Sequence, residues 1–210
     1  MSTSSITSVI EESIAAHKLE TAAVRLGEAL SVMYPDETAC LVFDGPNFQH
    51  TAKALGLNIE YSSLFDTLRS VTRLRSIHYF VGLSDDPHHA SARNQVTWMR
   101  NHGVRVHTRV SQKSVDPDGV ARWKANMDVE IAVATLTQCD KVDTVILATG
   151  DGDFVPLVKA LQARGQRVLL MSSEKTPEKQ LSDQLRTCVD GFIEVDDFEG
   201  TCATRVAEPV

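Results

Sequence analysis

Aspartates follow two short apolar segments of the chain, and their side chains are the first candidates for chemistry. Residues 41–48 read Leu-Val-Phe-Asp-Gly-Pro-Asn-Phe, and residues 145–154 read Val-Ile-Leu-Ala-Thr-Gly-Asp-Gly-Asp-Phe. Asp44 follows the first apolar run, and Asp151 and Asp153 follow the second. In a parallel α/β sheet, ligands collect at the carboxyl ends of the strands. We therefore expect these carboxylates to lie at one edge of a sheet.

A third acidic position and two glycines complete this candidate centre. Asp128 stands at the start of a helix expected over residues 127–138, whose apolar side chains would pack on the sheet. Gly150 and Gly152 allow a positive φ and leave room beside the backbone, so a tight turn there can aim both neighbouring aspartates at one point. Asp153 also fits a plain N-cap of the helix that follows.

Clustered carboxylates repel one another, and each resists ionisation unless a cation compensates the charge. Oxygen ligands without a Cys/His cluster favour Mg²⁺ or Mn²⁺ over zinc. Such an ion binds a phosphodiester oxygen and lowers the pKa of an attacking water, so the pattern indicates phosphodiester hydrolysis. A single loop aspartate beside a glycine is usually a turn or capping residue. The prediction therefore depends on the combination.

Short apolar runs that alternate with helical segments predict the order of the elements. Expected strands cover residues 39–43, 76–81, 104–108, 144–148, 167–171 and 192–195, and expected helices cover residues 60–71, 88–102, 127–138, 154–164 and 177–188. Strands that are apolar throughout are buried on both faces, and strand–helix alternation implies a parallel sheet between two layers of helices. We therefore predict an α/β three-layer sandwich, with the polar residues 111–122 as a surface loop.

The beginning of the chain has a different pattern. Apolar residues from Ile6 to Met33 recur mostly at steps of three and four, which predicts one or two amphipathic helices. The expected organisation is a helical appendage over residues 1–38, one domain over residues 39–196 and a tail over residues 197–210. Residues 1–34 are expected to pair with a second copy of the chain or with another protein.

Composition indicates a folded globular chain, with 42% hydrophobic and 23% charged residues. No apolar run approaches the roughly 18 residues that span a bilayer, and the first residues lack an export signal, so we expect no membrane association. His78 and His107 lie within apolar strands and are expected to be satisfied imidazoles. The cysteines form no CxxC pair, which predicts neither a zinc site nor a disulfide framework and favours the cytoplasm; they are Cys40, Cys139, Cys188 and Cys202.

Charge is distributed unevenly along a chain whose formal net charge is -7. Residues 1–38 carry two basic and six acidic side chains, whereas residues 69–124 carry ten basic and four acidic ones. A locally basic region can neutralise the backbone of a polyanion, although ordinary solvated helix faces have the same composition. Trp123, between Arg122 and Lys124, is a candidate for stacking on a base.

Three motifs, in the expected order, resemble those of NYN (LabA-like) domains in the PIN-like nuclease superfamily. Residues 42–48 are similar to the first-strand motif of the family, residues 127–133 (Met-Asp-Val-Glu-Ile-Ala-Val) to its central motif, and residues 146–157 (Ile-Leu-Ala-Thr-Gly-Asp-Gly-Asp-Phe-Val-Pro-Leu) to its most distinctive one. Residues 181–195 are similar to the closing helix and strand. The resemblance covers roughly residues 39–196.

The resemblance implies a PIN-like fold with a mainly parallel sheet of about five strands and an Mg²⁺- or Mn²⁺-dependent ribonuclease centre. By position, it implies metal ligands at Asp44, Asp128 and Asp151. Asp153 would be a further ligand or would hold a water on the ion. The four aspartates are therefore the expected catalytic residues.

Polar and aromatic side chains near the aspartates are the expected substrate contacts. The resemblance implies that Asn47 and Thr149 orient a ligand or a water without adding charge. Arg122, Trp123 and Lys124 are expected to contact RNA, which we expect to be single-stranded.

Two other functions fit the same residues. The chain could be a catalytically weak RNA-binding or protein-assembly module of PIN-like fold, or a metal-dependent phosphatase for small phosphate esters. Clustered negative charge gives no advantage to a pure binder of polyanions, which favours catalysis. A phosphatase leaves the extended basic region without a role.

Overall fold

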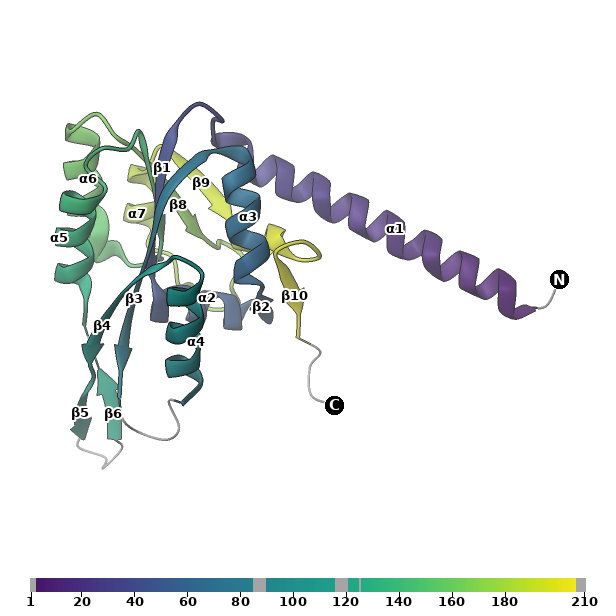
Figure 1. Ribbon diagram of the computed structural model, residues 1–210, viewed down its shortest axis with the longest axis horizontal. Helices are drawn as coiled ribbons and strands as arrows, with labels where there is room; N and C mark the ends of the chain where they lie inside the picture. Colours follow the sequence, from purple (N-terminus) through teal and green to yellow (C-terminus); the bar gives the residue numbers. More distant parts are fainter. Residues whose placement is uncertain (1–2, 85–89, 116–120, 125, 207–210) are drawn as a thin grey trace.

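A six-stranded parallel sheet forms the centre of the protein (Figure 1). The computed structural model describes residues 3–84, 90–115, 121–124 and 126–206, with the backbone alone for residues 3–10, 112–115 and 121–124. The strands are β1 (Thr38–Asp44), β3 (Arg73–Leu83), β4 (Arg105–Val110), β7 (Thr144–Ala148), β8 (Arg167–Ser172) and β9 (Gly191–Glu194). They lie in the order β4-β3-β1-β7-β8-β9, and every neighbouring pair is parallel. The chain therefore reverses its winding between β1 and β7, and such a switch point is where open α/β sheets bind ligands.

Helices cover both faces of this sheet, which confirms the predicted three-layer α/β architecture (Figure 1). One layer holds α2 (Gly45–Ala54), α3 (Tyr61–Val71) and α4 (Ala90–Asn101); the other holds α5 (Asp128–Gln138), α6 (Val155–Ala163) and α7 (Asp183–Cys188). Successive side chains of a strand point to opposite faces. Phe43 accordingly belongs to one core cluster together with Phe65 of α3, whereas Val42 belongs to the other together with Val158 of α6.

Three local predictions differ from the structure. The expected loop over residues 111–122 contains β5 (Gln112–Val115), which pairs antiparallel with β6 (Ala121–Lys124). The helix expected over residues 177–188 begins only at Asp183, because the Ser182 hydroxyl caps it by accepting from the Leu185 N–H at 3.5 Å. The sequence interpretation also missed α2 altogether. The first two residues of the helix expected over 88–102 lie outside the described residues.

The N-terminal helix α1 (Thr3–Ala29) projects from the body of the protein and leads into the short helix η1 (Leu30–Val32) (Figure 1). Near its C-terminal end, Ala22 is buried and Leu26 packs against the core. Residues 11–21 are exposed, and Ile14 and Leu19 are 51% and 62% accessible. An isolated helix of this kind gains little from its own hydrogen bonds in water. The predicted pairing through residues 1–34 remains a prediction. The predicted division of the chain at residues 38 and 196 also remains a prediction.

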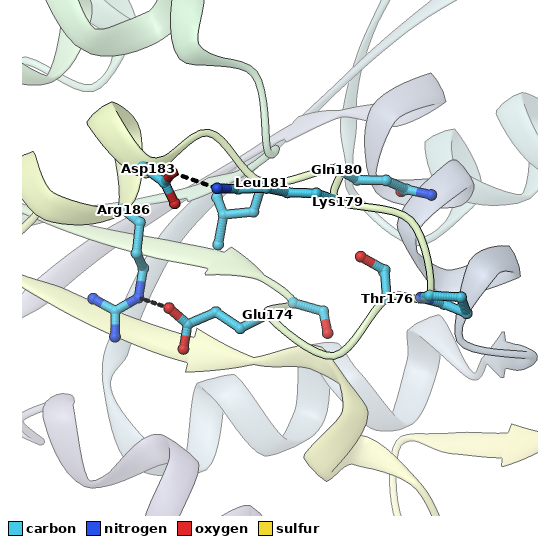
Figure 2. A pocket seen from close by; sticks show the side chains of 9 residues that line it. Glu174, Thr176, Lys179, Gln180, Leu181, Asp183 and Arg186 are labelled. Atoms are coloured by element: carbon cyan, nitrogen blue, oxygen red, sulfur yellow. Dashed lines mark hydrogen bonds and ion pairs between the residues drawn. The ribbon is translucent and has the colours of Figure 1, made fainter.

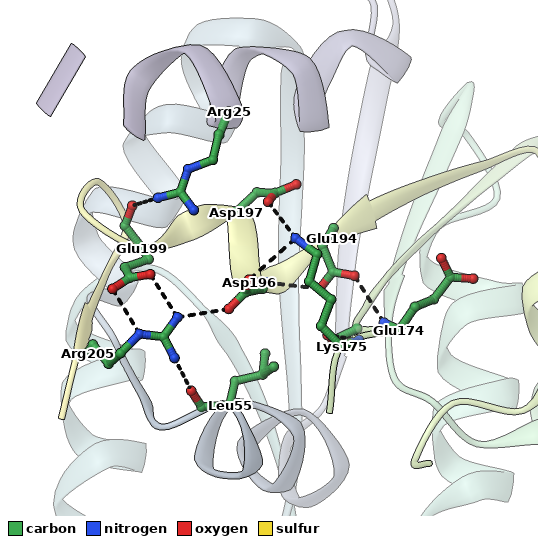
Figure 3. A network of polar contacts seen from close by, with 10 residues as sticks. Arg25, Leu55, Glu174, Lys175, Glu194, Asp196, Asp197, Glu199 and Arg205 are labelled. Carbon is green, nitrogen blue, oxygen red and sulfur yellow. Dashed lines mark hydrogen bonds and ion pairs between the residues drawn. The ribbon is translucent and has the colours of Figure 1, made fainter. Parts of the chain in front are cut away.

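A network of charged side chains attaches the last described residues to the domain (Figure 3). The strand β10 (Ala203–Arg205) pairs antiparallel with β2 (Leu57–Ile59), and the short helix η4 (Val195–Phe198) precedes it. Arg205 donates to both carboxylate oxygens of Glu199, at 2.9 and 2.7 Å, and to Asp196 at 3.0 Å. The Arg205 guanidinium lowers the pKa of Glu199. Arg25 of α1 donates to the Glu199 carbonyl at 3.4 Å, so α1 joins the same network.

A buried disulfide joins Cys40 of β1 to Cys139, the residue that follows α5. The expectation of no disulfide is wrong for this pair, because only the fold brings together two residues that are 99 positions apart.

His78 lies beside both sulfurs, and its ring nitrogens contact His107 at 3.1 Å and Ser76 at 3.2 Å. Burial, followed by His107 and Arg105, lowers the pKa of His78 to about 4, so it is a neutral core imidazole. A cytoplasmic location stays a prediction.

Among the described residues, the structure contains no helix with the length and hydrophobicity that crossing a bilayer requires.

Reduction of the Cys40–Cys139 bond is expected to lower the free energy of unfolding by about 3–4 kcal/mol, because the bond removes chain entropy from a long loop in the unfolded state. Urea denaturation with and without a phosphine reductant measures the difference. A Cys40→Ala/Cys139→Ala variant should not respond to the reductant, whereas Cys188→Ser should respond like the parent chain. Identical curves for the parent chain under both conditions would contradict the prediction.

Candidate active site

The first aspartate stands where β1 passes into α2. Asp44 is the N-cap of this helix, and its carboxylate accepts from the Asn47 N–H at 3.5 Å. Its other oxygen accepts from the Thr149 hydroxyl at 3.2 Å. A Cβ at Gly45 would lie 2.6 Å from the Phe80 carbonyl oxygen, so only glycine lets the chain turn this close to β3. Local packing and two hydrogen bonds therefore fix the Asp44 carboxylate at the end of the strand.

The second acidic turn follows β7 and is hydrogen-bonded to the first. Asp151 caps the short helix η3 (Gly152–Phe154) and accepts from the Asp153 N–H at 2.9 Å. The Thr149 hydroxyl oxygen accepts from the Asp151 N–H at 3.2 Å. The Asn47 side-chain oxygen accepts from the N–H of Gly150 at 2.8 Å. Asn47 and Thr149 thus connect the ends of the two strands at the switch point.

The two glycines of this turn are needed because a neighbouring segment leaves no room for a side chain, not because of their backbone conformation. Neither Gly150 nor Gly152 uses the positive φ that glycine allows. A Cβ at Gly150 would lie 2.6 Å from the Gln180 carbonyl oxygen, and one at Gly152 would lie 2.6 Å from the Ser182 hydroxyl. The segment between β8 and α7 therefore packs directly against the acidic turn, and side chains at these two positions would push it away.

Three of the four aspartates converge. Asp128 is the first residue of α5, and its N–H donates to the Asn126 side chain at 2.9 Å. The carboxylates of Asp128, Asp151 and Asp153 each offer an oxygen within 4.8 Å of the other two. Asp44 is not a member of this group and is connected to it through Thr149. The predicted set thus consists of a cluster of three and one half-buried carboxylate that Thr149 links to it.

Like charges and burial both act on these carboxylates. Burial raises the pKa of Asp44 to about 6, against the hydrogen bonds from Asn47 and Thr149, and the charges of Asp128 and Asp151 raise it further. The pKa of Asp128 is raised by burial and then by its acidic neighbours. Within the described side chains, no lysine or arginine pairs with any of the four aspartates. A set of uncompensated oxygen donors fits a hard divalent cation.

The basic region does not form one strip at this edge. Arg73 and Arg105 begin β3 and β4, at the opposite end of the sheet from the aspartates. Arg109, near the end of β4, donates to Glu130 at 2.8 Å and to the Asn126 carbonyl at 3.0 Å. This last contact supports the start of α5, a role that the sequence interpretation missed.

The three expected substrate contacts Arg122, Trp123 and Lys124 lie on β6, where they pair with residues of β5. Their side chains lie outside the described part of the chain. The predicted contacts with RNA stay predictions.

A hollow of about 410 Å³ opens beside the acidic turn. One wall is formed by Asn47 and residues 150–152, and the other by residues 179–183 of the segment between β8 and α7. Sequence reasoning missed the second wall, because these residues were assigned to a helix. The serine–aspartate pair at residues 182–183, a common start of a helix, is the signal for a helix that begins there and leaves the preceding residues in a loop.

Comparisons with known proteins agree with this arrangement. Residues 38–196 match the model of the NYN domain. The chain therefore belongs to the NYN domain family. It is similar to the low amplitude and bright protein LabA of Synechococcus elongatus, with 24% identity over 132 residues, which are 62% of this chain and 67% of that protein. A crystal structure of a protein of unknown function from Vibrio parahaemolyticus is also similar, with 25% identity and a TM-score of 0.60, covering 77% of this chain and 94% of the other.

Replacement of Asp44 by asparagine is expected to stabilise the metal-free protein at pH 7.5. The folded chain holds more protons at this position than the unfolded chain between the ordinary pKa of 3.8 and the raised value of about 6. Stability therefore falls as the pH rises through this window, by up to about 3 kcal/mol. Asparagine removes the buried charge and keeps an N-cap oxygen.

Chemical denaturation in chelator at pH 4 and pH 7.5 tests this expectation. The advantage of Asp44→Asn should be largest at pH 7.5 and small at pH 4. The exposed Asp66→Asn variant, as the control, should show no such dependence on pH. A variant less stable than the parent chain at pH 7.5 would contradict the raised pKa of Asp44.

Replacement of Gly150 by alanine is expected to lower the free energy of unfolding by about 1–3 kcal/mol, because the added methyl group overlaps the backbone at Gln180. Gly27→Ala is the matched control: it lies in α1 with no atom near its added Cβ, and it should be neutral or slightly stabilising. Thermal denaturation of both variants provides the comparison. Equal stability of Gly150→Ala and the parent chain would show that the two segments do not pack this closely in solution.

Proposed function

We propose that this NYN-domain chain is an Mg²⁺- or Mn²⁺-dependent ribonuclease. The observation that carries the proposal is the cluster of Asp128, Asp151 and Asp153, which places three carboxylates at the switch point of the sheet. Their mutual repulsion favours a bound cation. Membership of a family within the PIN-like nucleases supports the same chemistry.

The three clustered carboxylates would hold the ion, with Asp44 linked to them through Thr149. When bound, the ion would neutralise charge on a phosphodiester oxygen and lower the pKa of an attacking water. The Thr149 hydroxyl donates to the Asp44 carboxylate and accepts from the Asp151 N–H, so it fixes the two acidic turns relative to each other. The hollow bounded by Asn47 and residues 179–183 supplies space for the substrate next to the carboxylates.

We further propose that the substrate is single-stranded RNA and that the β5–β6 hairpin contacts it. The hairpin carries Arg122, Trp123 and Lys124 and follows β4 at the carboxyl end of the sheet, the end where the aspartates lie. Cations supply affinity for the phosphate backbone, and an aromatic ring stacks on bases with little sequence preference.

A binding or assembly module is the second candidate function. The exposed apolar side chains of α1, which include Ile14, Leu19 and Val24, favour an assembly role for that helix. This role is compatible with catalysis in the domain, so only the turnover of RNA distinguishes the two functions.

Cleavage of labelled RNA is the test of the proposed function. The chain should cut single-stranded RNA in Mn²⁺ or Mg²⁺ and lose activity in chelator. Asp128→Asn and Asp151→Asn should each reduce the rate on the order of 100-fold or more, because each removes a proposed ligand. Asp66→Asn, an exposed aspartate on α3, should retain full activity.

The other outcomes separate the alternatives. Structured RNA, DNA and a small phosphate ester are assayed in parallel, and preferential hydrolysis of the ester would favour a phosphatase. Tight RNA binding without cleavage would favour the module. Equal cleavage by the parent chain and both variants would identify a contaminating nuclease and remove support for the proposal.

A further inference from the structure

A second pocket adjoins the acidic site on the side of the β8–α7 segment. Its volume is about 330 Å³, at the low end of the ~300–1,000 Å³ typical of ligand pockets. Lys179, Gln180, Leu181 and Asp183 line both this pocket and the hollow beside Asp151. The same segment therefore forms a wall of both hollows.

The walls of this pocket are held in place from both ends. At one end, the Ser182 N–H donates to the Gly150 carbonyl at 2.9 Å. At the other, the Glu174 N–H donates to the Glu194 carboxylate at 3.0 Å, and the ammonium of Lys175 lies 3.4 and 3.0 Å from the carboxylates of Asp196 and Asp197 (Figure 3). The backbone of the segment is thus held at both ends relative to the aspartates.

The charges of the pocket are balanced, which argues against a phosphate as its occupant. Its charged residues are Lys179 with Asp183, and Arg186 with Glu174, each joined as an ion pair. Sites for phosphate groups present an excess of positive charge. Pro177 and Leu181 add apolar surface. Balanced polar groups beside apolar surface suit an uncharged, flat group such as a nucleobase.

One ion pair is arranged to present both donors and acceptors. Figure 2 shows Arg186 and Glu174 along one side of the pocket, with Leu181 and Gln180 along the other. Arg186 uses its Nε to reach Glu174 at 2.9 Å, and its guanidinium lies over the Phe192 ring at 4.3 Å. Among the described residues, both Nη groups of Arg186 and the second oxygen of Glu174 have no other partner. Both side chains line the pocket and are partly exposed, at 37% and 55%, so the pair offers N–H donors and a carboxylate acceptor to a ligand there.

We propose that this pocket binds a guanine base of the RNA strand, on the nucleotide next to the phosphodiester at the aspartates. Guanine carries two adjacent acceptors, O6 and N7, that match an arginine, and two adjacent donors, N1–H and N2–H, that match a carboxylate. Adenine has an amino group where guanine has O6, and pyrimidines lack the second ring. Glu174 and Arg186 are thus the residues that determine base specificity. This inference rests on the proposed ribonuclease function.

Binding of nucleosides tests the pocket without any cleavage. Guanosine, adenosine, cytidine and uridine are titrated into the full chain in chelator, because nucleosides carry no phosphate and need no ion. Guanosine should bind at least about 10-fold more tightly than the other three, as one matched set of base contacts provides. Glu174→Gln should remove this preference. Glu178→Gln should keep it, because Glu178 is an exposed acid of the same segment outside the pocket lining.

Cleavage of designed oligonucleotides separates this inference from the proposed function. Single-stranded oligouridines with one guanosine at different positions should be cut next to the guanosine, and Glu174→Gln should cut them without preference. Even cutting at every position, or equal binding of the four nucleosides, would overturn the guanine pocket while the ribonuclease function stands. Guanosine preference without cleavage of any oligonucleotide would support the pocket and overturn the ribonuclease function.

Discussion

The repulsion between aspartates that share one sheet edge is the constraint on which the rest of the site depends. Parallel pairing of β1 with β7 brings Asp44 and Asp151 to the same edge, and α5 adds Asp128. Such a group is stable only if backbone N–H groups or a cation compensate it. The chain uses backbone N–H groups for part of this compensation: Asp44 caps α2 and Asp151 caps η3. The remaining unfavourable charge is the physical reason to expect a divalent ion.

The strands could be predicted from the sequence because each is a short apolar run that is buried on both faces. Each of the six expected strands overlaps one strand of the sheet. The parallel arrangement follows from the helices between the strands. The helix α2 was missed because residues 45–54 are mostly polar and begin Gly-Pro, a pattern typical of a turn. Its proline stands at the first turn of the helix, where a proline is tolerated, and Phe48 alone contributes a large buried side chain. Tertiary packing, rather than the local pattern, therefore determines this helix.

The sequence predicts which carboxylates lie near one another better than it predicts contacts between segments far apart in the chain. The convergence of Asp128 with Asp151 and Asp153 follows from the positions of a helix start and a strand end. The separate position of Asp44 could not be deduced, because it depends on which side chain the Thr149 hydroxyl reaches. The role of Gly150 was misjudged for a similar reason. The fold alone brings a loop 30 residues further along against it.

The segment between β8 and α7 contacts the acidic turn at one end and the charged network of η4 at the other. Individual ion pairs on a protein surface contribute little to stability, about 0–1 kcal/mol each. Here several are joined: Lys175 pairs with Asp196, Asp196 with Arg205, and Arg205 with both oxygens of Glu199. A bidentate arginine contact within such a network holds its partners in a defined geometry. Because Arg25 of α1 contacts the Glu199 carbonyl, the projecting helix is attached to the same network as the pocket wall. The position of that wall therefore depends on contacts from both ends of the chain as well as on the glycines of the acidic turn.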